Sequence, residues 1–533
     1  MATSRAPAGQ TRAPFGLGLC GAAAFASSAG ALALEISAVR LLAPLVGTSL
    51  HIWTAVIATV VAGFTLGHWL GGRFADNGRP ASGAATALAL AAIACLATLA
   101  LFVAFASDMR AGSGAPIVHV AVLCLALFFA PTIAAGAVSP LLAKLAVDAN
   151  PAHEGRAIGT MFALGTLGAI AGALAAGFGL ISALGAAGTL LAVAALFGVL
   201  ATTIAWRAGH ARRAMAFAAL FASLAAGGGS IGFHRGPCTT ESAYYCIRLI
   251  DESALTGMPT MSIYLDHDAQ SSNIRDDPTF LYWSYAHFFD EILDVRLGAR
   301  IGGVHAFYLG GGGYSVPRAI IARDPLARIV VAELDPEVTA IAMSRMWVSA
   351  DPRMTVVHGD GRLALQALPE EPIFDVFFGD AYKGLQVPAH LVTREFNRAV
   401  RARLKPGGMH VINLIDARAS PHLLHAVVAT LALDHPVVEV WLESSEILSP
   451  ASTTYLIVAG DTPTPTGSFQ ARRGAKHAWV RLAPEDLRRD IAAHESPVLT
   501  DDFAPVDRLG ANFCSLRILS KLGIDLARTE RCP

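Results

Sequence analysis

The sequence predicts an α-helical membrane bundle of about seven spans, followed by an α/β domain built on a doubly wound sheet. The first indication is uneven composition: hydrophobic residues make up 54% of the 533-residue chain, mean hydropathy is +0.50, and the charge-poor stretch is residues 15–233. The second is the segment from Phe307 to Asp335, where an apolar strand is followed by four glycines, a helical pattern and a second strand that ends in acids. A chain of this length exceeds one core, so we expect at least two domains.

Seven mostly apolar segments of the first half are long enough to cross a bilayer. They are centred on residues 16–34, 50–71, 84–106, 117–137, 157–180, 187–206 and 214–233. We do not expect the first to be a cleaved signal peptide, because further spans follow it. The expected domains are therefore a multi-span transmembrane domain at 1–233, a linker with a small β-region at 234–300, and a Rossmann-like domain at 301–533.

Small residues predict how two of these spans pack. Gly63, Gly67 and Gly71 recur every four residues in the second span, and Gly168 and Gly172 have the same spacing in the fifth. Such a ridge lets a neighbouring helix approach closely. We therefore expect each ridge to lie against another helix.

Basic loops predict the orientation of the spans, because Lys and Arg are enriched on the cytoplasmic side. The N-terminal segment and the loops after the second, fourth and sixth spans are basic, whereas the intervening loops carry only Arg110. This pattern places the N-terminus in the cytoplasm. With seven spans in the cell membrane, the C-terminal domain then lies on the extracytoplasmic face.

Cysteine usage leaves two possibilities for the second half. Four cysteines lie near its two ends: Cys238, Cys246, Cys514 and Cys532. An even number fits disulfides in an oxidising compartment, and four free thiols is the alternative. The sequence contains no Cys/His cluster that predicts a metal site.

The glycine turn predicts a nucleoside site. Gly310–Gly313 leave no side chains where the backbone turns, so a ligand can lie against N–H groups and the start of the next helix. Glu333 follows Gly313 by twenty residues, which suits a carboxylate that binds ribose hydroxyls. Asp360 and Asp380 follow two further apolar strands. Because strand C-termini share one edge of such a sheet, these acids should meet the glycine turn there.

The motifs GGGGYSVPR, VVAELDPEV, HGDGR, FDVFFGDAY and TREFNRAVRARLKPGG together resemble the spermidine synthase family over about residues 241–415. The order of strands and helices is similar to the methyltransferase-type Rossmann sheet. With the spans before it, the chain resembles a bacterial group in which a multi-span segment is fused to such a domain. The resemblance implies a transferase of polyamine synthesis that moves an aminopropyl group from decarboxylated S-adenosylmethionine to an amine such as putrescine. It implies an S-adenosyl co-substrate and no tightly bound cofactor.

The same resemblance implies roles for individual residues. The Gly310, Gly311, Gly312 and Gly313 loop would pass beside the sulfur of the ligand, Glu333 would bind its ribose, and Asp360 with Gly361 would meet its adenine. Gln270 would lie against the ligand, and Asp380 would be the catalytic acid that accepts a proton from the amine. Candidates for binding the amine are Tyr285, Asp266 and Asp501; for the segment around Asp501 a turn or a helix N-cap is the alternative.

Two positions depart from the family pattern. Gly313 stands where the family loop GGGDGG has an aspartate that binds the aminopropyl amine, and Lys383 replaces a second aspartate near the catalytic acid. Both changes remove negative charge. Methyl transfer from S-adenosylmethionine, or its cleavage without an acceptor, is therefore the alternative reaction. A transporter with a ligand-sensing soluble domain is the alternative of a different class.

The expected partners are small-molecule substrates, the lipid bilayer and, in a homodimer, a second copy of the chain. Nucleic acid is not expected, because the net charge is −1. The predicted side of the membrane conflicts with the cytoplasmic synthesis of S-adenosyl compounds. Either the membrane half delivers a substrate, or one span is miscounted.

Overall fold

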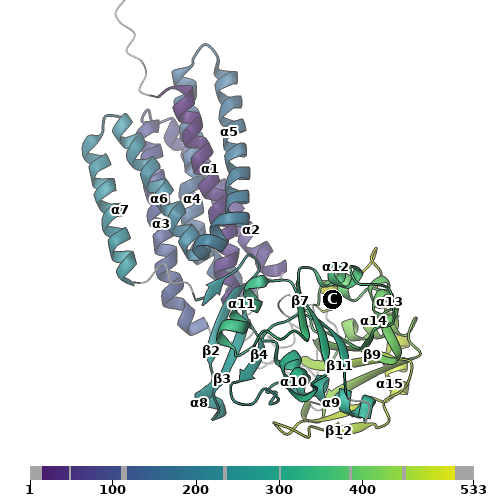
Figure 1. Cartoon of the computed structure of the whole chain (residues 1–533). Helices are drawn as coiled ribbons and strands as arrows, with labels where there is room; N and C mark the ends of the chain where they lie inside the picture. Colours follow the sequence, from purple (N-terminus) through teal and green to yellow (C-terminus); the bar gives the residue numbers. More distant parts are fainter. Residues whose placement is uncertain are drawn as a thin grey trace, which may run out of the picture. The chain divides into compact units, whose positions relative to one another are not determined.

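The computed structural model describes residues 15–46, 50–109, 117–231, 237–298, 302–382, 384, 387–446 and 452–510. The chain divides into two compact units, Met1–Cys246 and Ile247–Pro533. The first is helical and the second mixes helices and strands (Figure 1). The division falls after residues 237–246, because this segment is hydrogen-bonded to helices of the first unit.

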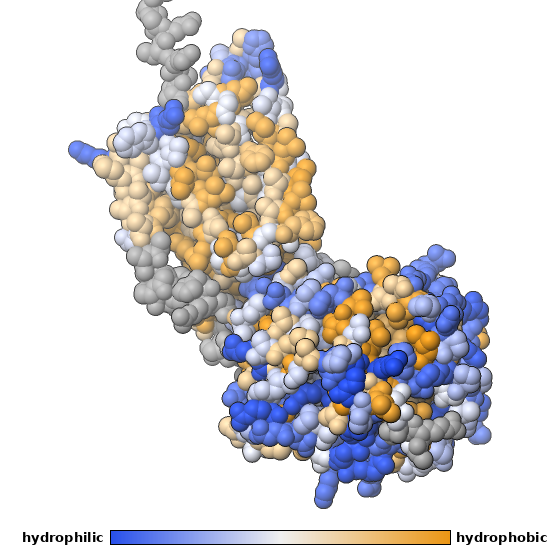
Figure 2. Space-filling model, in the orientation of Figure 1, coloured by the Kyte–Doolittle hydropathy of each residue, from blue (hydrophilic) through white to orange (hydrophobic). Residues whose placement is uncertain are grey.

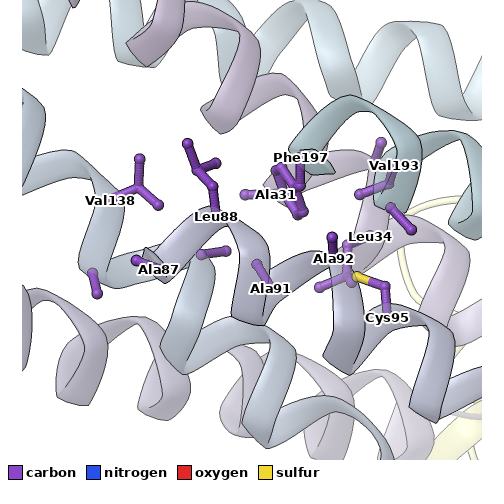
Figure 3. Packing of buried hydrophobic residues seen from close by; sticks show 14 of the residues in the cluster. Ala31, Leu34, Ala87, Leu88, Ala91, Ala92, Cys95, Val138, Val193 and Phe197 are labelled. Carbon is purple, nitrogen blue, oxygen red and sulfur yellow. The ribbon is translucent and has the colours of Figure 1, made fainter. Parts of the chain in front are cut away.

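The first unit is a bundle of long apolar helices (Figure 1). They are α1 (Leu17–Val46), α2 (Leu50–Ala75), α3 (Pro80–Met109), α4 (Ile117–Ala149), α5 (Glu154–Ala175), the π-helical turn η1 (Ala176–Leu180), α6 (Ile181–Arg207) and α7 (Ala211–Ile231). The face of this unit that Figure 2 shows is largely apolar. Inside it, Leu34 of α1, Leu88 of α3 and Phe197 of α6 are fully buried among small residues (Figure 3).

Five candidate membrane spans, judged by length and composition, lie in the described part of the bundle: Leu17–Val46, Ile52–Ala75, Pro80–Ala104, Val120–Ala149 and Glu154–Arg207. An apolar helical region is therefore present, but the predicted count of seven spans is not confirmed. The fifth candidate is 54 residues long and includes Gly185, whose φ of 74° and ψ of 171° interrupt the helix. Helix α7, which the sequence also indicated as a span, is not among the five.

The glycine ridges pack as predicted. A Cβ atom at Gly63, Gly67 or Gly71 of α2 would collide with atoms of α4. A Cβ at Gly168 or Gly172 of α5 would collide with the backbone of α1. Each ridge thus permits backbone contact between two helices.

Residues 237–246, which follow α7, are hydrogen-bonded to two helices of the bundle. Arg40, near the end of α1, donates to the carbonyl oxygens of Tyr244 (2.5 Å) and Ser242 (2.7 Å). Glu241 accepts from Ala186 N (2.8 Å), directly after the break at Gly185. Since a helix start leaves backbone N–H groups without partners, Glu241 satisfies one of them.

One disulfide is present in this segment, between Cys238 and Cys246. The expectation of a disulfide is met for this pair, while Cys514 and Cys532 lie outside the described residues. The three cysteines of the helices are buried and free: Cys20, Cys95 and Cys124.

A small antiparallel sheet begins the second half. Its order is β1-β2-β3-β4, with β1 (Thr240–Glu241), β2 (Cys246–Asp251), β3 (Thr260–Leu265) and β4 (Asp268–Ile274). The short helix α8 (Ser253–Thr256) connects β2 to β3. This is the predicted small β-region.

The large sheet has nine strands in the order β12-β13-β10-β11-β9-β8-β5-β6-β7. Its strands are β5 (His305–Leu309), β6 (Arg328–Glu333), β7 (Met354–His358), β8 (Phe374–Gly379), β9 (Leu404–Ala417), β10 (Val437–Glu443), β11 (Ser452–Gly460), β12 (Ser468–Gln470) and β13 (Ala478–Arg481). Strands β5 to β9 pair in parallel, and the remaining pairs are antiparallel. The chain order reverses between β5 and β8, which makes this the switch point where doubly wound sheets bind ligands.

Helices cover both faces of the large sheet. They are α9 (Ser284–Leu297), α10 (Ser315–Arg323), α11 (Pro336–Arg345), α12 (Gly361–Gln366), α13 (Arg394–Arg401), α14 (His422–Leu431), α15 (Pro484–Ala493) and α16 (Val506–Leu509), with the short turns η3 (Ala389–Leu391) and η4 (Ser444–Glu446). One core joins α9 and α10 to Tyr308 and Phe378, and another joins α12 and α13 to Phe307 and Phe377. Alternate residues of each strand therefore point to opposite faces of the sheet. The predicted doubly wound α/β sheet is present.

Candidate active site

The predicted site residues meet at the C-terminal edge of the parallel strands. Gly310–Gly313 follow β5, Glu333 ends β6, Asp360 follows β7 and Asp380 follows β8. The ends of β5 and β8 touch: Asp380 N donates to Leu309 O (3.1 Å), and a Cβ at Gly310 would lie 2.5 Å from Asp380 O. Gly310 also has a φ of 91°, so glycine is required there for conformation and for space.

Glu333 holds the glycine loop in shape. One of its carboxylate oxygens accepts from Gly311 N (2.6 Å) and Gly312 N (3.3 Å), and the other accepts from Asp335 N (2.8 Å). The side chain is buried, and this burial raises the pKa of Glu333 although the backbone donors oppose the shift. The side chain of Glu333, which is predicted to bind the ribose, is therefore held in place by hydrogen bonds from the glycine loop.

Asp360 caps the start of α12. Its Oδ1 accepts from Arg362 N (3.0 Å) and Leu363 N (3.1 Å), and Oδ2 lies 2.7 Å from His390 Nε2. Burial acts to raise the pKa of Asp360, but these hydrogen bonds outweigh it and lower the pKa. Gly361 packs so closely on Leu309 that a side chain there would collide with it.

Strand β4 forms a wall beside the glycine loop. Ser271 Oγ accepts from Gly313 N (2.6 Å), and Asn273 Nδ2 donates to Gly313 O (2.7 Å). Gln270 precedes them, and its Cβ would lie 3.8 Å from a Cβ at Gly312. The small sheet thus places Gln270 beside the loop, and its contact with a ligand stays a prediction.

We expect Gly313→Ala to lower the thermal stability of the protein. A Cβ at this position would overlap Ser271 Oγ and lie 2.8 Å from Met346 Cε. Overpacking of this kind costs about 1–3 kcal/mol, which thermal unfolding of the full chain in detergent would detect. The matched control is Gly467→Ala, since a Cβ at Gly467 meets no atom within 4 Å. Equal melting temperatures for the two variants would contradict this packing.

Asp380 is partly buried and has a separate donor for each carboxylate oxygen. Asn413 Nδ2 donates to Oδ1 (2.9 Å), and the Tyr308 hydroxyl donates to Oδ2 (3.0 Å). Burial raises the pKa of Asp380 to about 7, against the effect of both hydrogen bonds. A carboxyl group with such a pKa can accept and release a proton near neutral pH.

The remaining predicted residues have varied surroundings. Tyr285 lies beside Gln270, because its hydroxyl donates to Gln270 O (2.6 Å), and burial followed by the Asp380 charge raises the pKa of Tyr285. Asp266 is buried, and its carbonyl oxygen accepts from Arg248 (3.1 Å). Lys383 lies outside the described residues.

Asp501 lies in a turn closed by a bridge between Thr500 and Phe503. Its two carboxylate oxygens accept from the Arg362 guanidinium at 2.7 and 2.6 Å, and one also accepts from Thr393. Asp501 therefore braces α12, the helix that Asp360 caps. This geometry corresponds to the turn that was the alternative to a substrate contact.

Sequence reasoning missed Tyr308, Asn413, Ser271 and His390. Tyr308 and Asn413 interrupt the apolar runs AFYL and VINLI, and this interruption was the available signal. Ser271 directly follows the predicted Gln270, but its partner Gly313 is 42 residues away. His390 precedes α13 with no motif of its own.

Comparison with known proteins finds similarity to polyamine aminopropyltransferases and also to an eEF1A lysine and N-terminal methyltransferase of Danio rerio, which is 32% identical over 115 residues. The chain is 32% identical over 106 residues to a polyamine aminopropyltransferase of Vibrio vulnificus, a match that covers 20% of this chain and 36% of that protein. It is 27% identical over 430 residues to polyamine aminopropyltransferase 2 of Streptomyces coelicolor, covering 77% of this chain and 76% of that protein. Because 77% is more than the second unit holds, this match extends into the helical unit.

A solved spermidine synthase from Thermotoga maritima aligns with 53% of this chain and 86% of its own, at 18% identity and a TM-score of 0.34. No family model matches the chain. The C-terminal part of the chain is similar in sequence to proteins named polyamine aminopropyltransferases, and the apolar helices before it fit a fused membrane segment.

Proposed function

We propose that this protein is a membrane-anchored transferase that moves an aminopropyl group from decarboxylated S-adenosylmethionine to a small amine such as putrescine. The observation that supports this most is the carboxyl group of Asp380. It lies at the switch point of the sheet, beside the glycine loop that Glu333 holds, and burial raises its pKa to about 7. The named activity of the relatives supports the same reaction.

In the proposed reaction the amine nitrogen attacks the propyl carbon bonded to the sulfonium sulfur. A C–N bond forms, the C–S bond breaks with its electron pair going to sulfur, and methylthioadenosine leaves as a neutral thioether. Asp380 takes the proton that the amine loses. The glycine loop and Glu333 would orient the nucleoside so that nitrogen, carbon and sulfur lie in line.

Mass spectrometry of products would test this proposal. The purified full-length protein is given decarboxylated S-adenosylmethionine or S-adenosylmethionine, each with and without putrescine. We expect methylthioadenosine and spermidine only when the decarboxylated donor and putrescine are both present. S-adenosylhomocysteine as the nucleoside product would instead establish methyl transfer and reject the proposal.

Methyl transfer is the second candidate, and the surroundings of Gly313 favour it. Gly313 supplies no carboxylate like the one that the family uses to bind the aminopropyl amine, and a side chain at this position would displace Ser271 Oγ and Met346 Cε. The same product assay distinguishes the two reactions.

We further propose that the C-terminal unit faces the extracytoplasmic side. The basic loops support this, and so does the Cys238–Cys246 disulfide, because disulfides persist in oxidising compartments. Alkaline phosphatase, which is active only where its own disulfides form, should be active when fused after Pro533. A cytoplasmic reporter such as β-galactosidase, active at the same position, would contradict this orientation.

A further inference from the structure

Two side chains outside the family motifs contact the carboxylate of Asp380. We propose that Tyr308 and Asn413 are positioning residues, which orient this carboxylate and favour its ionised form. The inference rests on the proposed function, since it assigns both residues to the proton transfer of that reaction. It adds to that function two residues that control the orientation and the ionisation of the Asp380 carboxylate.

The two donors hold the carboxylate from both sides. Asp380 follows β8, Tyr308 belongs to β5 and Asn413 to β9, and these two strands flank β8 in the sheet. Each oxygen has its own donor, at 3.0 Å from the Tyr308 hydroxyl and 2.9 Å from Asn413 Nδ2. Rotation of the carboxylate would break both hydrogen bonds, because such bonds weaken steeply away from linearity. The carboxylate lone pairs that accept no hydrogen bond therefore point in a fixed direction.

The donors are themselves fixed. Tyr308 is 3% exposed, and its ring packs against Phe289 (6.2 Å between ring centres) and Phe378 (5.4 Å). The backbone carbonyl of Asn413 accepts from the Tyr382 hydroxyl at 2.7 Å. Tyr308 therefore cannot turn away without disturbing a packed neighbour, and the backbone that carries Asn413 is held by a hydrogen bond.

The charge of Asp380 depends on these two neutral donors. The titratable groups around it are Tyr285 of α9, Tyr308 of β5, Tyr382 after β8 and Asp416 of β9, which interacts with Tyr382. No described residue forms a salt bridge with Asp380. Burial raises its pKa and the two hydrogen bonds oppose the rise. Loss of either bond should therefore raise the pKa further.

The pH dependence of kcat/KM tests the proposal on the full-length protein. In Tyr308→Phe and in Asn413→Leu, the acidic limb of the profile should move to higher pH by about one unit or more, the usual size of a lost hydrogen bond to a charged group. The matched control is Tyr314→Phe, which removes an equally buried hydroxyl that contacts Thr339 instead (2.6 Å). Its acidic limb should stay in place.

Infrared titration separates this inference from the proposed function. The absorption of the protonated carboxyl group, identified by its loss in Asp380→Asn, reports the ionisation of Asp380 without any substrate. A higher titration midpoint in Tyr308→Phe and an unchanged midpoint in Tyr314→Phe support the positioning role even if no amine is turned over. An unchanged midpoint in Tyr308→Phe, or equal shifts in both tyrosine variants, overturns it.

Discussion

Asp380→Asn should reduce turnover by about 10²–10⁴-fold, the usual contribution of a general base, while nucleoside binding survives. The same change should stabilise the protein at pH 8. The folded-state pKa of Asp380 is raised to about 7, so its favourable contribution to stability is present at acidic pH and is lost as pH rises through 7. An uncharged amide does not lose stability as the pH rises. We therefore expect the free energy of unfolding at pH 8 to be about 2–4 kcal/mol higher in the variant. Product formation and thermal unfolding of the full chain measure the two effects.

Asp375 provides the matched control, since it lies near the other end of the same strand. It accepts from His305 N (2.9 Å) and forms an ion pair with Lys405 (2.8 Å), away from the site. Asp375→Asn should leave turnover within a few-fold of the natural protein and should not stabilise it. Full turnover in Asp380→Asn would remove Asp380 from the mechanism.

Glu333→Gln should weaken binding of the S-adenosyl donor by about 10²–10³-fold. Both carboxylate oxygens of Glu333 accept backbone N–H groups. The amide NH₂ of glutamine would face one of these donors and would also replace an acceptor for a ribose hydroxyl. Two affected hydrogen bonds to a charged group correspond to about 3–4 kcal/mol.

Calorimetry with methylthioadenosine, which does not react further, measures this loss. Glu337→Gln is the control, because Glu337 is exposed on the first turn of α11, four residues along the chain. Its affinity for the nucleoside should not change. A dissociation constant of Glu333→Gln within threefold of the natural protein would show that Glu333 does not bind the ribose.

The edge of the sheet could be predicted because its signal is local. Two apolar strands are followed at once by a predicted site residue: Leu309 by Gly310, and Gly379 by Asp380. The partners of these residues could not be predicted, because they are distant in sequence. Tyr308 lies 72 residues from Asp380, and Asn413 lies 33 residues from it. A polar residue inside an apolar strand does not reveal which group it will meet.

The number of spans was the least predictable feature of the helical unit. Between Arg156 and Arg207 the chain carries no charged residue to mark where one span ends. Glycine is common in membrane helices, so the sequence does not distinguish Gly185, which breaks the helix, from Gly168 or Gly172, which pack within one.

The hydrogen bonds that Arg40 donates to residues 242 and 244 have a consequence for the assembly of the protein. Arg40 is synthesised with the first helix, but the carbonyl group of Tyr244 that it binds is 204 residues further along the chain. These hydrogen bonds can form only after every helix of the bundle has left the ribosome. Until then the guanidinium must remain hydrated at the membrane surface or find transient partners. Formation of these hydrogen bonds is therefore a late event in assembly, and it requires that all helices of the bundle are in place.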